Sequence, residues 1–457
     1  MSPADRPVND AGFGPVSGPI VGPIEGPVEE SVETVVDDSG RRRRQMKHFA
    51  GLTTARGAAS AISGIWIIVA ARRLTITQFG DLSILLALGS IFINISDVGL
   101  QVVIGDHVAR AGSMSRRVVL EGVRRRLVYA AGCAVCVVVL YLVAASDKNV
   151  VVPLVFAGSV LGTAVYQIVL AAYRAQGRVT ADAVNEVASR SGLLICGFAV
   201  LVFGWGLVGA SAVYGAADLV SAVAVTAFVA RRYFVRDDAA APPDLRLRAT
   251  APLAVAITIW LVYLRIDGYL VGLLSGPSEA GLYGAAYRFL DVAMLPALVL
   301  SHTVLAHVSP LNGRERLAEI HRFLRLSVGV AIPIAIGGSL LVGPVLVWLF
   351  PPAFASAQAV AVLLLISSVP GAVVATLAPL AGVSDRRQFA YAAAAALGFN
   401  VALNLVLIPR YGAAGAAWAT VISQVFLGAA LYPVVRRGCT RREPSAVVSS
   451  TPEDPPC

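Results

Sequence analysis

Long apolar runs constrain this chain more than any other feature of its sequence. Stretches of roughly 20 apolar residues recur along nearly the whole chain, and a helix needs about that length to cross some 30 Å of hydrocarbon. Only 14% of the 457 residues are charged, against about 25% in soluble domains. Continuous runs also exclude a barrel of alternating strands. We therefore expect an all-α polytopic membrane protein.

Twelve apolar spans can be counted, each bounded by charges, Pro or Gly. They cover approximately 52–71, 80–106, 127–145, 150–173, 187–204, 207–230, 250–274, 279–306, 325–349, 356–383, 388–408 and 413–435. With a cytoplasmic N-terminus, the inside segments hold 30 Lys and Arg residues and the outside loops hold four. Because basic residues collect on the cytoplasmic side, both termini are predicted to be cytoplasmic.

The two ends of the chain differ in composition from the apolar spans. Residues 1–40 repeat Gly-Pro and hold eight acidic residues and one basic residue, and four arginines follow at 41–44. Such a segment is typical of a disordered tail. We expect a cytoplasmic tail over 1–47, six-helix halves over 48–235 and 236–436, and a C-terminal tail over 437–457. The positive charge outside the first tail suits membrane lipids as partners, and nucleic acid is not expected.

An internal repeat supports the division into halves. LTITQFGDLSILLAL starts at Leu74 and LSGPSEAGLYGAAYRFL starts at Leu274, each opening a helix after a short loop. Gly206-Leu-Val-Gly-Ala likewise matches Gly412-Ala-Ala-Gly-Ala. The offsets of 200 and 206 residues predict two halves in the same orientation, with a substrate path between them near the membrane midplane.

Four charges fall within the seventh and eighth spans at one predicted depth: Arg265, Asp267, Arg288 and Asp291. Charges inside a membrane are costly and call for a reason. Arg288 and Asp291 share a helix face, whereas Arg265 and Asp267 point about 200° apart around a helix. Two interpretations stay open: a hydrated cavity whose guanidinium groups hold phosphate or diphosphate, or an ion-pair network that joins the two helices.

Polar residues of the first half are candidates for the opposite wall of such a cavity. They are Asn94 and Asp97 in the second span and Asp218 in the sixth. No basic neighbour within the same helix neutralises the two carboxylates. Arg56, at the cytoplasmic end of the first span, is a candidate for capturing a headgroup.

Enzyme chemistry finds no support in the sequence. The chain has no GxxxxGK[ST] phosphate loop, no HExxH motif and no Ser/His/Asp arrangement near a strand-turn-helix. Loops of about 20 residues are too short to fold a catalytic module. We expect no enzyme activity and no cofactor.

Three segments resemble bacterial polysaccharide flippases of the multidrug/oligosaccharidyl-lipid/polysaccharide exporter superfamily. FNVALNLVLIPRYGAAGAAWATVIS, from Phe399 to Ser423, matches the pattern N-x-x-L-N-L-x-L-I-P-x-x-G-x-x-G-A-A-x-A-T nearly in full. LRIDGYLVGLLSGPSEAGLYGAAYRFLD, from Leu264, and ARRLTITQFGDLSILLALGSIFINISDVGL, from Ala71, resemble the openings of that family's two halves. The resemblance implies two six-helix bundles around a V-shaped central cavity that opens alternately to each side.

The same resemblance implies a function. It is outward movement of undecaprenyl-diphosphate-linked oligosaccharide across the bacterial cytoplasmic membrane, with Arg56, Arg265, Arg288, Asp267, Asp291, Asp97, Asp218 and Asn94 as substrate contacts. Glycosyltransferases and a polymerase of the same pathway are expected partners. The alternatives are an ion-coupled drug or small-molecule antiporter, a membrane polysaccharide polymerase or ligase, and a scaffold without transport.

Overall fold

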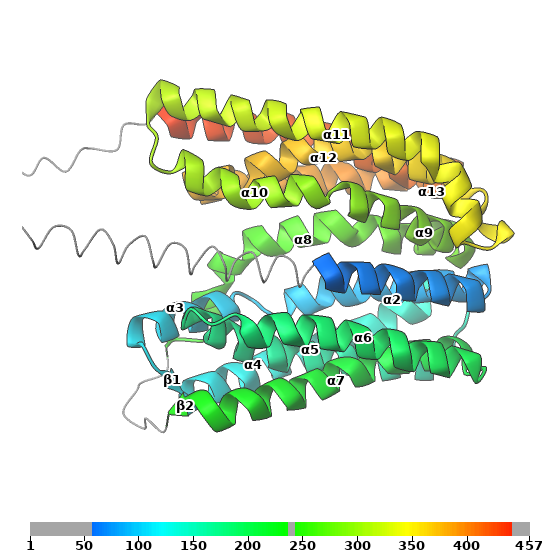
Figure 1. Ribbon diagram of the computed structural model, residues 1–457, viewed down its shortest axis with the longest axis horizontal. Helices are drawn as coiled ribbons and strands as arrows, with labels where there is room; N and C mark the ends of the chain where they lie inside the picture. The colour runs from blue at the N-terminus through cyan, green and yellow to red at the C-terminus, as the bar shows by residue number, and fades with distance from the viewer. Residues whose placement is uncertain (1–56, 236–242, 441–457) are drawn as a thin grey trace, which may run out of the picture. The chain divides into compact units, whose positions relative to one another are not determined.

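The computed structural model describes residues 57–235 and 243–440, and these residues are almost entirely helical (Figure 1). A first helix covers 57–73. The further helices are α2 (Ile76–Ile95), α3 (Leu100–Ala111), α4 (Arg116–Ala144), α5 (Val151–Ala175), α6 (Thr180–Val202), α7 (Gly206–Tyr233), α8 (Leu247–Ser275), α9 (Pro277–Ala293), α10 (Leu295–Val308), α11 (Gly313–Leu349), α12 (Ala357–Ser384) and α13 (Arg386–Thr440).

Each of the twelve predicted spans contains helix, so the expected all-α membrane fold is confirmed. Nine helices of the described chain are long and apolar enough to cross a membrane, and α9 with α10, which meet at a bend of 47°, make a tenth. Two more predicted spans are accounted for by the helix at 57–73, described only from residue 57, and by α13, which contains two helices. The protein is therefore a multi-pass membrane protein.

The predicted repeat is visible in the backbone at two matching glycines. α7 begins at Gly206 with φ +54°, and α13 breaks at Gly412 with φ +55°. This left-handed conformation is accessible to glycine at little cost. Beyond the break, the backbone N–H of Ala413 donates to Glu279 Oε2 at 2.8 Å. A carboxylate at this position satisfies an otherwise unpaired donor at a helix start.

The repeated segments pack against each other where α2 crosses α9. A Cβ on Gly80 would lie 1.7 Å from the carbonyl oxygen of Pro277, and a Cβ on Gly281 would lie 2.7 Å from that of Ile76. The side-chain hydroxyls of Thr77 and Ser278 are 3.3 Å apart at the same crossing. The absence of side chains at both glycines lets the two backbones approach closely, as small residues do in membrane helix packing.

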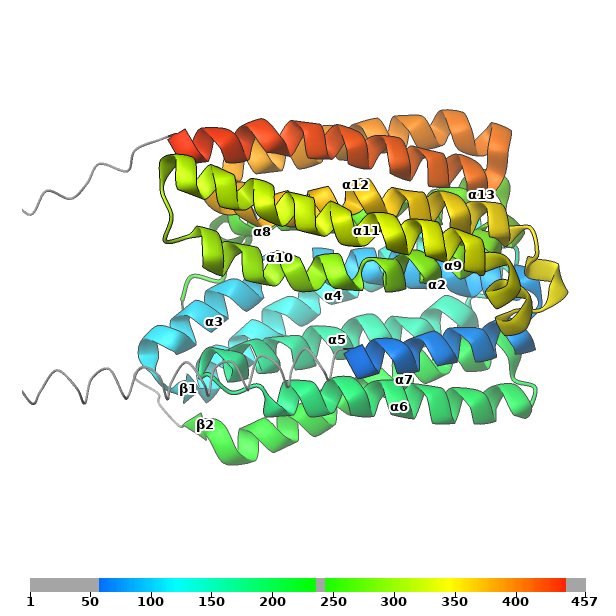
Figure 2. The same cartoon turned by 45° about the horizontal axis from the view of Figure 1, so that its top comes forward.

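The helices before and after residue 235 form two groups in Figures 1 and 2. In the first group α5 packs extensively against α7 and also contacts α4, while in the second α12 and α13 pack together and α8 lies against α13. Contacts of α2 with α8 and α9 join the groups. This junction is where a path between the halves is expected.

Two features differ from the sequence-based prediction. The second span, expected over 80–106, is interrupted between α2 and α3, where Val98 has φ +44° and Gly99 has φ +78°. A positive φ is rare for a β-branched residue, which makes this break hard to foresee. Helices α4 and α11 also begin about 11 to 12 residues before their predicted spans. The apolar runs did not predict these first turns because they are rich in charged residues.

Two short strands belong to the first group of helices. One lies between α3 and α4, and the other directly follows α7. They are β1 (Met114–Ser115) and β2 (Phe234–Val235), and they pair in parallel with Met114 opposite Phe234. The tail expected over 1–47, the candidate Arg56 and residues 441–457 lie outside the described residues.

Candidate substrate cavity

A cavity of about 240 Å³ lies among helices of both groups. Its walls come from the helix at 57–73, α2, α6 and α7 on one side and from α8 and α9 on the other. The polar side chains that line it are Ser63, Ser83, Ser90, Arg190, Tyr214, Arg265, Asp267, Tyr283, Tyr287 and Arg288. A cavity with a few convergent polar groups among apolar walls is the usual form of a binding site.

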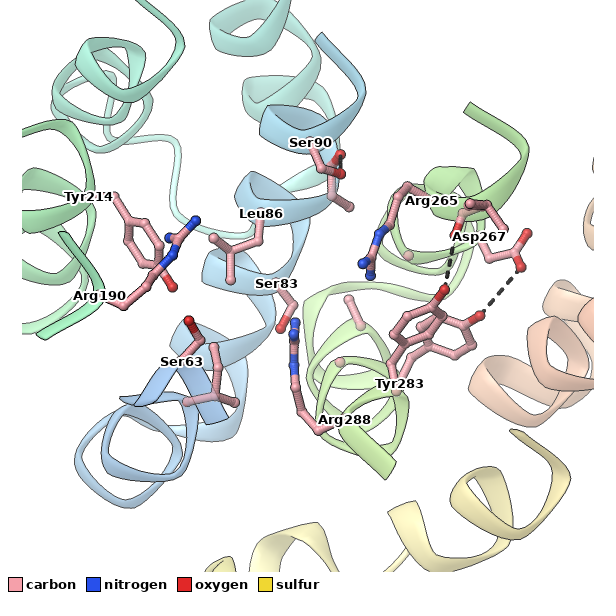
Figure 3. A pocket seen from close by; sticks show the side chains of 17 residues that line it. Ser63, Ser83, Leu86, Ser90, Arg190, Tyr214, Arg265, Asp267, Tyr283 and Arg288 are labelled. Carbon is pink, nitrogen blue, oxygen red and sulfur yellow. Dashed lines mark hydrogen bonds between the residues drawn. The ribbon is translucent and has the colours of Figure 1, made fainter. Parts of the chain in front are cut away.

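Three arginines from three helices point their guanidinium groups toward this space (Figure 3). Arg190 comes from α6, Arg265 from α8 and Arg288 from α9. Their side chains keep 32%, 40% and 33% of their surface exposed, respectively. All three arginines are therefore partly exposed lining residues of the same cavity.

Two carboxylates lie within ion-pair distance of these arginines. Asp291 is 3.0 Å from Arg288 Nη1 and 3.6 Å from Arg265 Nη2, and Glu186 is 3.7 Å from Arg190. Three guanidinium groups therefore have two carboxylates within 4 Å, and a third carboxylate, Asp218, interacts with Arg190 from behind the cavity. Arg265 also lies over the ring of Tyr287, with 4.9 Å from its guanidinium carbon to the ring centroid. The aromatic face stabilises the cation and fixes its direction.

Asp267 borders the cavity, but its carboxylate points away from the arginines (Figure 3). Its side chain accepts hydrogen bonds from Asn404 Nδ2 at 2.8 Å and Thr420 Oγ1 at 2.7 Å, and Tyr283 adds a longer one at 3.4 Å. The residue is only 4% exposed. These bonds join α8, α9 and α13, and the contact of Asp267 with substrate stays a prediction.

Asp97 and Asn94 lie outside the lining of the cavity. Asp97 is 3.3 Å from Arg126 Nη1 of α4, and Arg126 is fully buried and also donates to Gln167 at 2.6 Å. The amide of Asn94 donates back to the carbonyl of Ser90 at 2.6 Å. Neither residue therefore forms the cavity wall expected of the first half, and Asp97 lies against the buried Arg126 at the break after α2.

Asp218 lies behind the cavity rather than in it. It is 8% exposed on α7, and Ser159 Oγ of α5 donates to its carboxylate. It also lies close enough to Arg190 for an electrostatic interaction. Asp218 can therefore hold Arg190 from behind while that arginine faces the cavity.

Sequence reasoning missed Arg190 as a cavity residue. The fifth span was predicted to start at residue 187, and Arg190 was counted among the basic residues of an inside loop. In the structure α6 starts at Thr180, after Gly177 with φ +71°. Gly177 was the available signal, since glycine frequently ends a helix and allows a new one to begin.

No group of three or more His, Cys, Asp or Glu side chains suited to a metal ion occurs within 57–235 and 243–440. The carboxylates nearest the cavity are instead used by arginines or by neutral hydrogen-bond donors. The chemistry of the cavity is therefore that of cationic and neutral donors, which suits an anionic ligand with hydroxyl groups.

Comparison with known proteins gives a family and a fold. The family model described as polysaccharide biosynthesis protein matches residues 46–308, more than half of the chain. No curated protein sequence matches the chain. Among solved structures, an inward-facing multidrug resistance MATE family transporter of the MOP superfamily has a TM-score of 0.62 at 12% identity, covering 84% of this chain and 93% of that one.

Two further solved structures share the fold. The lipid II flippase MurJ in an inward closed conformation has a TM-score of 0.63 at 11% identity, covering 84% of this chain and 87% of that one. A MOP superfamily transporter from Pyrococcus furiosus, described as having a binding pocket of reverse polarity, has a TM-score of 0.55 at 12% identity, covering 86% and 95%. At these identities the likeness concerns the fold.

Proposed function

The chain belongs to the polysaccharide biosynthesis protein family, and on this premise we propose that it is a flippase for a polyprenyl-diphosphate-linked oligosaccharide. Its fold is that of MOP superfamily transporters. The observation that carries the proposal is the convergence of Arg190, Arg265 and Arg288 on one cavity between the two groups of helices. A diphosphate presents several oxygens that planar guanidinium groups bind in pairs.

The cost of these arginines supports a binding role. A charged side chain at membrane depth costs on the order of 2.5–3.5 kcal/mol on insertion scales. The ion pairs of Asp291 with Arg265 and Arg288 offset part of that cost while no ligand is bound. An arriving diphosphate would replace this shared carboxylate, so the site exchanges one anion for another without leaving a cation unpaired.

The sugars of the substrate would meet the hydroxyl groups of the cavity. Ser63, Ser83, Ser90 and Tyr214 lie on the side opposite α8 and α9. Ser83 and Ser90 donate to backbone carbonyls of their own helix, so their oxygens are acceptors for sugar hydroxyls. Arg190 lies beside Tyr214 (Figure 3) and would contact both the diphosphate and the first sugar.

Movement between inward-open and outward-open states would use the α2–α9 crossing. The backbones come closest at Gly80 and Gly281, which belong to the repeated segments of the two halves. Because neither glycine presents a side chain there, the helices can rock without interlocking side chains. In a bacterium this cycle would carry the glycan outward across the cytoplasmic membrane, with both termini inside and pathway glycosyltransferases and a polymerase as partners.

The alternative of an ion-coupled antiporter for cationic drugs fits the cavity less well. The three arginines line the cavity, whereas their carboxylate partners Glu186, Asp218 and Asp291 do not, so a cationic substrate would meet the guanidinium groups first. A polysaccharide polymerase or ligase would need groups for acid-base catalysis that face the cavity. Asp267, which borders it, has its carboxylate held by neutral donors and turned away from the arginines.

The test is outward translocation of a fluorescent polyprenyl-diphosphate oligosaccharide in proteoliposomes. The wild type is compared with Arg265→Gln, Arg190→Gln and the control Arg322→Gln, whose arginine is 75% exposed on α11 away from the cavity. We expect at least a tenfold lower rate for the two cavity variants and an unchanged rate for the control. Exchange of a cationic dye by a wild type that moves no lipid-linked sugar would refute the proposal.

A further inference from the structure

The hydroxyl group of Tyr214 is held at the cavity wall by a buried partner. Tyr214 lies on α7 and lines the cavity, whereas Trp66, on the helix at 57–73, is 1% exposed and does not line it. The indole Nε1 of Trp66 donates a hydrogen bond to the phenolic oxygen of Tyr214 at 2.8 Å. An indole N–H can only donate, so the direction of this hydrogen bond is fixed. Nothing in the proposed transport cycle uses Trp66.

The packing around this pair fixes both rings. The ring centroid of Tyr214 lies 6.1 Å from that of Trp66 and 5.9 Å from that of Phe156 on α5. The indole lies directly against α6, because a Cβ on Gly197 would be 2.2 Å from Trp66 Cζ3. A Cβ on Gly89 of α2 would likewise be 2.6 Å from Phe156 Cε1. Glycines at these two positions therefore make room for the aromatic rings that hold Tyr214 in place.

The hydrogen bond from Trp66 leaves the Tyr214 hydroxyl with one proton to donate. Among the residues that the structure describes, none accepts this proton. The hydroxyls of Ser83 and Ser90 are in the reverse state, since both donate to backbone carbonyls of α2, at 2.8 and 2.9 Å. The first-half wall of the cavity therefore offers acceptors on α2 and a directed donor on α7.

A cation lies next to this donor. Arg190 of α6 lies beside Tyr214 (Figure 3), and the charges of Arg190 and Arg288 both act on the phenol. A hydrogen bond is roughly twice as strong when one partner is charged. An oxygen that carries no proton, on a phosphate or a carbonyl group, gains from the O–H donor and from the guanidinium group together. A sugar hydroxyl gains less from the cation.

We propose that Tyr214 donates a hydrogen bond to an oxygen of the substrate that carries no proton, and that Trp66 is the positioning residue that directs this donor. The inference rests on the proposed flippase function. The acceptor is either a phosphate oxygen of the diphosphate or the carbonyl oxygen of an acetamido group on the first sugar. Without the indole N–H, the phenolic oxygen is free to accept a hydrogen bond, and the preference for such an acceptor is lost.

The test measures dissociation constants on the purified full-length protein by isothermal titration. The ligands are farnesyl diphosphate and its conjugates with glucose and with N-acetylglucosamine. Tyr214→Phe removes only the hydroxyl, and Trp66→Phe removes the N–H donor. Benzothienylalanine at position 66 also removes the donor but keeps the shape of the indole, in case Trp66→Phe folds poorly. The controls are Tyr391→Phe and Trp418→Phe on α13, which are 74% and 48% exposed and outside the cavity lining.

We expect Tyr214→Phe to weaken binding about tenfold and loss of the Trp66 donor to weaken it about threefold, with both controls unchanged. Combined with Tyr214→Phe, loss of the Trp66 donor should have no further effect, because its action requires the hydroxyl. Equal weakening for all three ligands identifies a phosphate oxygen as the acceptor. Weakening confined to the N-acetylglucosamine conjugate identifies the acetamido carbonyl.

Unchanged affinity of Tyr214→Phe for all three ligands would overturn the donor role, as would equal weakening confined to the two sugar conjugates, which points to a sugar hydroxyl. An effect of Trp66 that is the same with and without Tyr214→Phe would overturn the positioning role, because packing does not require the hydroxyl. Arg265→Gln is measured in parallel. If it weakens binding while Tyr214→Phe does not, only this inference fails, whereas a wild type that binds none of the ligands refutes the proposed function as well.

Discussion

Arg126 and Arg265 both lie in apolar helices with an aspartate nearby, yet they serve different purposes. Arg126 is fully buried, 3.3 Å from Asp97 and bonded to Gln167. Arg265 is 3.6 Å from Asp291 and keeps 40% of its side chain exposed toward the cavity. The ion-pair distances are nearly the same. Access from the cavity, and not the presence of a partner, distinguishes the arginine that we propose to bind substrate from the buried arginine.

The largest expected effect is loss of stability on removing Arg126. In Arg126→Leu the carboxylate of Asp97 and the amide of Gln167 lose their buried partner, and breaking a buried pair costs about 3–5 kcal/mol. The free energy of unfolding in mixed detergent micelles should fall by that amount. The double variant Arg126→Leu/Asp97→Leu should recover part of it, since no unpaired charge is left. A double variant no more stable than the single one would contradict the pairing.

Arg265→Gln should show the opposite pattern. A hydrogen bond to a charged group contributes about 1.5–3 kcal/mol, so the transport rate should fall about tenfold to a hundredfold. Because the side chain is partly exposed, the free energy of unfolding should change by less than about 1 kcal/mol. Transport and unfolding are measured on the same preparation. If Arg265→Gln unfolded as readily as Arg126→Leu, the distinction between the two arginines would be lost.

The arginines of the cavity also show how much of this molecule can be predicted from its sequence. Apolar runs and the repeat offsets predicted the helices and the matching glycines Gly206 and Gly412, because hydrophobic length and backbone conformation are local properties. For Arg265 and Arg288 the sequence left a cavity and an ion-pair network open, and in the structure both arginines line the cavity and both pair with Asp291. Arg190 was missed because the polar first turns of α6 resemble a loop.

The partner of Asp291 within its own helix could be predicted, but those of Asp267 and Asp97 could not. Asp267 bonds to Asn404 and Thr420, 137 and 153 residues away, and Asp97 pairs with Arg126 across a break between helices. Such contacts depend on how helices distant in sequence pack. The segment from Phe399 to Ser423 pointed to the family, but nothing local indicates that its Asn404 and Thr420 close around a carboxylate on α8.

Asp267→Asn tests whether that enclosed carboxylate joins the helices or binds substrate. The asparagine amide would face donors from Asn404, Thr420 and Tyr283, so at least one buried donor loses its acceptor, at a cost of about 1–3 kcal/mol. The free energy of unfolding should fall accordingly, with the substrate KM nearly unchanged and the maximal rate lowered. A raised KM with unchanged stability would return Asp267 to the substrate-binding set.

Asp291→Asn should give the smallest effect. The sign of the change in affinity for a diphosphate is what tests the proposal. Asp291 holds Arg265 and Arg288 while the cavity is empty, and an incoming diphosphate would compete with it for both guanidinium groups. Removing its charge should therefore tighten binding of a soluble diphosphate analogue by a few fold, about 0.5–1 kcal/mol for a partly exposed pair. Isothermal titration of the purified protein measures this, with Glu319→Gln, an acidic residue beside Arg322 and away from the cavity, as the matched control. Weaker binding in Asp291→Asn would mean that the carboxylate orients the arginines for the ligand instead of competing with it, and the exchange of anions proposed for the cavity would then have to be abandoned.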